Sequence, residues 1–136
     1  MPALSKDAMA DAPTRSAPIV LTKLIPVLAV RDLDEALRYY TGVLGWSEAW
    51  KWGEPPHRAG VAIGDFEIQL DAGGRGATPG QSIIYCHMTG VEDFYRQCQR
   101  RSARMLRELE QRPWGVVDFQ VEDPSGNRVG FAELLK

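Results

Sequence analysis

Short apolar runs alternate along this chain with two stretches in which apolar residues recur at helical spacing. Residues 19–30 are apolar and rich in β-branched side chains, which favours a strand, and Pro26 indicates an edge position or a break in its pairing. Helical spacing follows at Leu33, Ala36, Leu37, Tyr40 and Leu44. The pattern therefore predicts a strand and then a helix.

The first predicted helix carries signals at both ends. Asp32 is a good N-cap residue, and Glu35 follows three residues later, as in a capping box. Gly42 and Gly45 mark the end of the helix. Three strands are predicted after it, over residues 46–52, 60–63 and 66–70.

The same order of elements then repeats. A strand over residues 82–88 precedes a helix over residues 91–101, and strands over residues 116–121 and 128–134 follow. Glycine-rich residues 72–80 indicate a linker between the halves, because neither Gly-Lys-Ser/Thr nor a helix follows them as in a phosphate loop. The repeat predicts an internal duplication and the α+β class.

Length and composition fit a single globular domain. The chain has 136 residues, of which 44% are hydrophobic. This is enough for a hydrophobic core without stabilising disulfides or metal ions. We expect one domain over residues 18–136, with module one at 19–72, a linker at 73–81 and module two at 82–135. Residues 1–17 are rich in Ala, Pro and Ser and lack the apolar segment of a signal peptide, which predicts a disordered leader.

Charge and cysteine content narrow the partners. The formal net charge is −2, which provides no basic field for nucleic acid but would tolerate or weakly attract a cationic ligand. No apolar run approaches the roughly 18 residues of a membrane span. Cys86 and Cys98 are expected to be reduced and buried, as in a cytoplasmic protein.

Strand alternation divides the side chains of the predicted strands between two faces. One face is apolar and suits packing against helices; Cys86 belongs to it, which argues against a nucleophile. The other face collects Glu67, Gln69, Tyr85, His87, Asp118, Gln120 and Arg128. Alternation alone would also produce such a face on the solvated side of an antiparallel sheet.

Two segments carry a family resemblance. The first is Ile25-Pro-Val-Leu-Ala-Val-Arg-Asp-Leu-Asp34, continued by Tyr39-Tyr40 and Leu44-Gly45-Trp46. The second is Arg112-Pro-Trp-Gly115, continued by Glu122-Asp-Pro-Ser-Gly-Asn127 and Val129-Gly-Phe-Ala-Glu133. Together they resemble the glyoxalase/bleomycin-resistance/dioxygenase (vicinal oxygen chelate) superfamily, most closely its bleomycin-resistance branch. The resemblance implies two βαβββ modules whose antiparallel-rich sheets curl into a cup lined by the polar face.

The resemblance also locates the positions at which metal-using members place His, Glu or Gln. Here they correspond to Ile25, Gln69, Ile83 and Gly130. Two aliphatic residues, one amide and one glycine do not supply the converging ligands that a divalent ion needs, so neither a metal nor another cofactor is expected. An unconventional site in which His87 joins Glu67 and Gln69 is the metal alternative.

The resemblance gives Trp114 a specific role, because the matching Trp of the bleomycin-resistance branch stacks on the flat part of the drug at the rim of the cup. Arg58 or His57 stands where a second stacking aromatic would be. Trp50 and Trp52 share a strand face and either contact ligand or pack at an interface. The expected ligand-binding residues are Trp114, Trp50, Trp52, Glu67, Gln69, Tyr85, His87, Asp118 and Arg128, and no catalytic residue is expected.

These observations favour a metal-free protein that sequesters an aromatic small molecule, a cationic one included, with Glu67 and Asp118 as negative partners. Antibiotic resistance would be one outcome. The alternatives are a metal-dependent lyase, transferase or dioxygenase of the same superfamily, and an interaction module without a small ligand. The resemblance and the exposed edges of a single module predict a homodimer, with modules pairing within or across chains.

Overall fold

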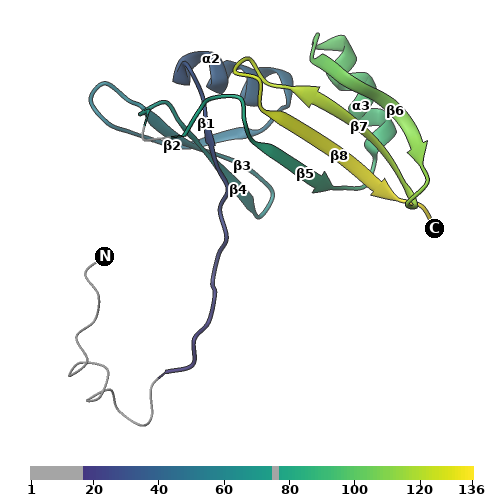
Figure 1. The fold of residues 1–136 in the computed structure, drawn as a ribbon, viewed down its shortest axis with the longest axis horizontal. Coiled ribbons are helices and arrows are strands. Elements are labelled where there is room, and N and C mark those ends of the chain that lie inside the picture. The colour runs from purple at the N-terminus through teal and green to yellow at the C-terminus, as the bar shows by residue number, and fades with distance from the viewer. Residues whose placement is uncertain (1–16, 75–76) are drawn as a thin grey trace.

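The structure is a computed structural model and describes residues 17–74 and 77–136. The leader predicted for residues 1–17 lies, except for Ala17, outside the described residues. The described chain forms two separate four-stranded sheets (Figure 1). Each sheet is accompanied by helical segments from its own half of the chain.

Both halves have the order βαβββ. The first comprises β1 (Val27–Ala29), α2 (Leu33–Arg38), the π-helical segment η1 (Tyr39–Val43), β2 (Ser47–Trp52), β3 (Arg58–Ile63) and β4 (Phe66–Asp71). The second comprises β5 (Ile83–His87), α3 (Val91–Arg100), β6 (Arg104–Arg112), β7 (Val116–Glu122) and β8 (Arg128–Leu134). The strand orders are β1-β4-β3-β2 and β5-β8-β7-β6. In each sheet the first strand in the chain pairs in parallel with the last one in the chain, β1 with β4 and β5 with β8. The predicted α+β fold of two βαβββ modules is confirmed, and neither sheet closes on itself.

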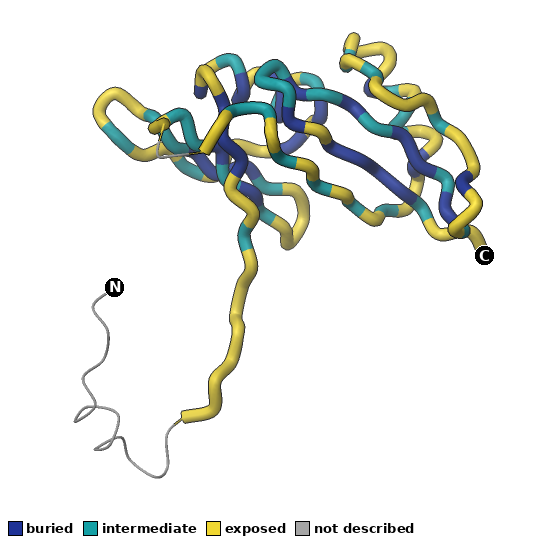
Figure 2. The backbone as a smooth tube through the Cα atoms, viewed as in Figure 1, coloured by how far each residue is buried: buried dark blue, intermediate teal, exposed yellow. Residues whose placement is uncertain are grey.

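The predicted first strand is much shorter than expected. Of residues 19–30, only Val27–Ala29 form a strand, which lies at a sheet edge as Pro26 indicated. Residues 17–26, here called the N-terminal arm, extend away from the sheets without secondary structure (Figures 1 and 2). Its exposed apolar side chains are Ile19, Val20, Leu21 and Leu24. An apolar, β-branched pattern predicts an extended backbone. It does not show whether a neighbouring strand is available to pair with that backbone.

Helix α2 begins where its capping signal predicts. The carboxylate of Asp32 accepts a hydrogen bond from the backbone N–H of Glu35 at 2.9 Å. The α-helix ends at Arg38 and continues as η1, and Gly45 follows with a φ of 79° that suits glycine. The predicted start is therefore confirmed, while the predicted single helix is two helical segments.

Strand β6 has no counterpart among the predicted strands, and its residues are mostly charged or polar. It pairs only with β7, and its register shifts between Met105 and Arg107 and again between Arg107 and Glu110. Such irregularities interrupt the strict alternation by which a strand is recognised in a sequence. Charged side chains on an edge strand also discourage pairing with other sheets.

The core lies between the helical segments and one face of each sheet. Its largest fully buried residues include Tyr40, Phe119, Leu28 and Leu70. Buried backbone runs along β7 and β8 in Figure 2. Cys86 packs against this core as predicted, and burial raises the pKa of its thiol to about 11, so it stays protonated at neutral pH.

The two modules are joined by the turn between β7 and β8. Buried Asp123 accepts a hydrogen bond from the hydroxyl of Tyr40 at 2.9 Å, and buried Asn127 donates one to the carbonyl of Ala29 at 2.9 Å. We call Asp123 and Asn127 the latch. No described strand of one sheet is hydrogen-bonded to a strand of the other, so β1 and β5 each leave one edge open.

Candidate ligand-binding site

The register of the second sheet gathers several predicted residues on the face away from α3. One row of opposed residues consists of Tyr85, Gly130, Gln120 and Arg107. The next row consists of His87, Ala132, Asp118 and Glu110. Opposed residues in a sheet point to the same side, so Tyr85, His87 and Asp118 share one surface, as alternation predicts.

The ring of Tyr85 lies on the backbone of the neighbouring strand. A Cβ atom added to Gly130 would come within 2.7 Å of the Cδ1 atom of this ring. The hydroxyl of Tyr85 donates a hydrogen bond to the Asp118 carboxylate at 2.7 Å. Burial and this hydrogen bond raise the pKa of Tyr85, so the phenol stays protonated. Glycine at 130 thus leaves room for the edge of the ring, while the hydrogen bond to Asp118 anchors its hydroxyl.

Asp118 is only 4% exposed and is neutralised by a neighbouring guanidinium. Arg112, also buried, donates from Nε to the Asp118 carboxylate at 2.6 Å and from Nη1 to Glu110 at 2.6 Å. Burial alone would raise the pKa of Asp118, but the hydrogen bonds from Arg112 and Tyr85 outweigh it and lower the pKa. Asp118 is therefore charged, and both of its carboxylate oxygens accept hydrogen bonds within the protein.

Trp114 lies on the turn between β6 and β7 and is 59% exposed. It lies near enough to Tyr85 to oppose the rise in the pKa of the phenol. His87 packs edge-on against Tyr85, with ring centroids 5.4 Å apart. Arg128 is exposed at the start of β8, opposite Ile83 and Glu122. Trp114, Tyr85 and His87 together form an exposed aromatic surface.

The first sheet carries a comparable arrangement on the face away from α2. The indole of Trp50 lies so close to Gly60 that a Cβ atom there would collide with it. Its Nε1 donates to the Glu67 carboxylate at 3.1 Å, and Lys23 from the N-terminal arm donates to the same carboxylate at 3.1 Å. The hydrogen bonds from Trp50 and then Lys23 lower the pKa of Glu67. Glu67, like Asp118, is paired rather than free to receive a cationic ligand.

Arg58 is a member of this surface that was not among the expected ligand-binding residues. Its Nε donates to the side-chain carbonyl of Gln69 at 2.9 Å, and its Nη1 lies 3.6 Å from Asp71. Trp52 is 64% exposed and packs edge-on against His57 with centroids 5.3 Å apart. Alternation could have placed Arg58 here, because the strand begins at residue 58 rather than 60.

Two of the four positions that the resemblance matches to metal ligands, Gln69 and Gly130, have contacts within their own sheets. Gln69 is hydrogen-bonded to Arg58, and Gly130 lies beneath Tyr85. Among residues 17–74 and 77–136, no group of three or more His, Cys, Asp or Glu side chains is placed to hold a metal ion. The unconventional set would need His87 on β5 to join Glu67 and Gln69 on β4, which belong to different sheets. A metal-free site stays a prediction that elemental analysis can test.

The structure thus divides the expected ligand-binding residues into two groups. The first sheet holds Trp50, Trp52, Glu67 and Gln69. The second sheet and its β6–β7 turn hold Tyr85, His87, Trp114, Asp118 and Arg128. Each group has an aromatic ring that lies on a glycine and is hydrogen-bonded to a carboxylate.

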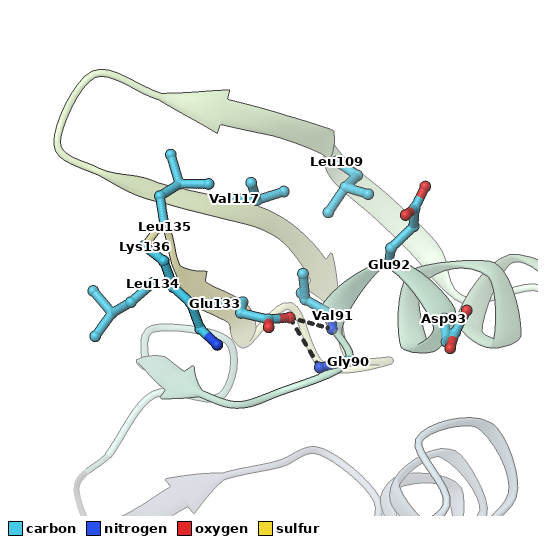
Figure 3. Close-up of a pocket in the computed structure, with 10 residues that line it drawn as sticks. All are labelled: Gly90, Val91, Glu92, Asp93, Leu109, Val117, Glu133, Leu134, Leu135 and Lys136. Atoms are coloured by element: carbon cyan, nitrogen blue, oxygen red, sulfur yellow. Dashed lines mark hydrogen bonds between the residues drawn. The ribbon is translucent and has the colours of Figure 1, made fainter.

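A separate hollow of about 550 Å³ lies beside the first turn of α3 (Figure 3). Val91, Leu109 and Val117 line it, together with the chain end around Leu135. The backbone N–H groups of Gly90 and Val91 donate to the Glu133 carboxylate at 2.9 and 3.0 Å, so this carboxylate already caps the helix. None of the expected ligand-binding residues lines this hollow.

Comparison with known families gives a match over residues 10–136 to the family described as "Glyoxalase superfamily protein". The chain belongs to the glyoxalase superfamily. The resemblance carried by its two end segments is therefore confirmed. No curated protein matches the sequence of this glyoxalase-superfamily member.

Several solved structures share this fold at low sequence identity. An antibiotic-binding protein from Streptomyces sp. CB03234 superposes with a TM-score of 0.76 at 19% identity, covering 86% of this chain and 99% of its own. A glyoxalase/bleomycin resistance protein from the same organism gives 0.68 at 21% identity, covering 79% and 96%. The bleomycin-binding protein from Streptomyces verticillus, solved with copper(II)-bleomycin, gives 0.70 at 20% identity, covering 84% and 97%.

These likenesses establish the fold of the superfamily member and not its ligand. As for membrane association, the described helices include none with the length and apolar character needed to cross a bilayer. The longest of them, α3, has 10 residues.

Proposed function

We propose that this glyoxalase-superfamily protein binds a flat aromatic small molecule without a metal ion and sequesters it. The observation that carries the proposal is the exposed surface of Trp114, Tyr85 and His87 above the buried Arg112–Asp118 pair. Aromatic side chains held at fixed angles offer stacking area at low conformational cost. Exposed aromatic surface on an otherwise polar sheet face is typical of a ligand site rather than of a solvated face.

The side chains of the two sheet faces support binding rather than catalysis. The thiol of Cys86 faces the core, and the hydroxyl of Tyr85 and the carboxylate of Asp118 are occupied by each other. A general base or nucleophile would need a free, suitably placed group within reach of a bound ligand. Sequestration requires only affinity, so stoichiometric capture of an antibiotic, as the names of the two Streptomyces binding proteins suggest, is the form of the function we propose.

We also propose that two copies assemble into a homodimer, with residues 18–136 as the folded unit. Each sheet leaves an open edge at β1 or β5, and Ile83 and Tyr85 on β5 are 61% and 46% exposed. The N-terminal arm adds apolar side chains that are exposed in a single chain, with Ile19 100% and Leu21 85% exposed. A second copy would cover these surfaces and bring two aromatic faces together.

Free Cys86 and Cys98 are consistent with the cytoplasm as the location that we propose.

Isothermal titration calorimetry can test the proposed binding directly, because it needs no fluorescent residue as a reporter. Metal-free bleomycin and the uncharged aromatic 2-naphthalenemethanol would each be titrated into the purified protein. We expect saturable binding of the uncharged probe, lost in Trp114→Ala and restored in Trp114→Phe, which keeps a stacking ring. Bleomycin binding at about one ligand per chain would assign antibiotic capture. Saturable binding that is unchanged in Trp114→Ala would remove the stacking claim, and no binding of either molecule would remove the proposed function.

A further inference from the structure

Among the described residues, the charged groups without an ion partner on the open face of the second sheet are arginines. Arg112 pairs with both Asp118 and Glu110, and Tyr85 also donates a hydrogen bond to Asp118. One cation thus serves two carboxylates, and the positive excess on this face comes from the other arginines. On the first sheet, Glu67 forms an ion pair with Lys23 and accepts a hydrogen bond from Trp50. Asp71 lies 3.6 Å from Arg58. The carboxylates that a cationic ligand would use are therefore already paired.

The unpaired arginines lie next to the aromatic surface. Arg107 stands in the same row of opposed residues as Tyr85 and is near enough to act electrostatically on both Tyr85 and Asp118. Arg128 stands in the adjoining row, between Ile83 and Glu122. The other neighbour of Glu122 is Arg104, at 3.8 Å and with a side chain 76% exposed. These two rows therefore carry three arginines, at positions 104, 107 and 128, and one carboxylate, that of Glu122.

This local excess opposes the net charge of the whole chain. The chain carries −2 overall, but a bound molecule responds chiefly to charges within about 10 Å, the Debye length at 0.1 M salt. Among the described residues, neither Arg107 nor Arg128 has an ion pair within 4.0 Å. Guanidinium groups bind carboxylate, sulfonate and phosphate oxygens in pairs and can do so beside a stacked ring.

We propose that the ligand of this face is an aromatic anion, whose ring stacks on Trp114 and Tyr85 while its acidic group is held by Arg107 and Arg128. This inference rests on the proposed function and adds the charge of the ligand to it. A cationic aromatic would meet these two guanidinium groups, whereas the nearby carboxylates Asp118, Glu110 and Glu122 already contact arginines. Its ring could stack equally well, but its charge would be repelled.

Three probes with one ring system separate the charge from the stacking. They are naphthalene-2-sulfonate, uncharged 2-naphthalenemethanol and cationic 2-naphthylmethylammonium, each titrated by calorimetry at low salt. We expect the sulfonate to bind about tenfold more tightly than the alcohol, as two charge-assisted contacts allow, and the ammonium more weakly than either. The preference should shrink as salt approaches about 1 M, where the Debye length is about 3 Å.

Substitutions then assign the preference to residues. In Arg107→Gln/Arg128→Gln, the ratio of sulfonate to alcohol affinity should fall to about one. Arg96→Gln is the matched control, because Arg96 lies on α3 at the other side of the sheet and pairs there with Glu92. The control should keep the wild-type ratio.

The outcomes distinguish the two claims. Binding of the alcohol without any preference for the sulfonate, or with a preference for the ammonium, would overturn the anionic ligand and leave aromatic binding in place. A sulfonate preference that survives in the double variant would also overturn the assignment to Arg107 and Arg128. Failure of all three probes to bind would remove the proposed function and this inference together.

Discussion

The Cδ1–Cε1 edge of the Tyr85 ring lies against Gly130, the position that the family resemblance matches to a fourth metal ligand. No left-handed backbone angle requires glycine there, so the missing side chain serves the close approach of the ring. Because a Cβ atom would come within 2.7 Å of the ring, Gly130→Ala should displace Tyr85 and break its hydrogen bond to Asp118.

We expect Gly130→Ala to lower the free energy of unfolding by about 1–3 kcal/mol, the usual cost of overpacking a site. Urea denaturation would measure it, and near-ultraviolet circular dichroism would report the displaced ring. Gly42→Ala is the matched control, because nothing lies within 4 Å of an added Cβ atom there and its backbone angle is ordinary. Equal stability of the two variants would show that the ring does not depend on glycine.

The buried Arg112–Asp118 pair predicts a large effect when one partner is removed. Arg112→Met would leave the Asp118 carboxylate buried without its cation, which typically costs about 3–5 kcal/mol. Arg96→Gln, which removes one exposed helix pair, should cost less than about 1 kcal/mol. Chemical denaturation at neutral pH compares the two, and similar small losses would contradict a buried, unsolvated pair.

The same pair predicts how stability depends on pH. The pKa of Asp118 is lowered in the folded protein, so its contribution to stability is present above the pKa of the unfolded chain, about 3.9 for Asp, and is lost as pH falls through the folded pKa. The stability difference between wild type and Arg112→Met should therefore narrow as pH falls below about 4. Denaturation midpoints at several pH values would show it. A difference that stays constant down to acid pH would mean that Asp118 does not titrate with the pair.

Some of this site follows from the sequence, and some depends on pairing that a sequence does not display. Asp32 caps its helix and Pro26 lies beside an edge strand because both effects are local. Alternation places Tyr85, His87 and Asp118 on one face for the same reason. By contrast, the contact between Tyr85 and Gly130 and the bond from Arg112 to Asp118 arise from strand neighbours and side-chain packing. Charged, irregular β6 gives no recognisable period, so the position of Arg107 beside the aromatic surface could not be predicted.

The metal content of the purified protein distinguishes a metal-free binding protein from a metal-dependent enzyme. Protein purified without chelators should contain far less than one divalent ion per chain, and added zinc should not raise Tm, because Ile25, Ile83 and Gly130 offer no side-chain ligand. Elemental analysis and thermal denaturation measure both quantities. A stoichiometric metal ion would instead favour the lyase, transferase or dioxygenase alternative.

The N-terminal arm gives the test of the proposed homodimer. Leu21→Asp/Leu24→Asp replaces side chains that are 85% and 83% exposed, so it should not affect the fold of one chain. If the arm packs on a second copy, burying two charges there should raise the dimer dissociation constant at least tenfold. Leu134→Asp, 65% exposed at the end of β8, is the control. Sedimentation velocity would measure the association, and a monomeric wild type would refute the dimer itself.

The latch has a consequence for how this protein can diverge. Asp123 and Asn127 hold the orientation of one module against the other, yet neither belongs to the two aromatic faces. A substitution in the latch can therefore alter the angle between the faces while leaving the chemistry of each untouched. Substitutions at Trp114 or Arg107 do the reverse. Shape and chemical preference can change independently in such a scaffold, so a lineage can reach a new ligand without rebuilding its fold.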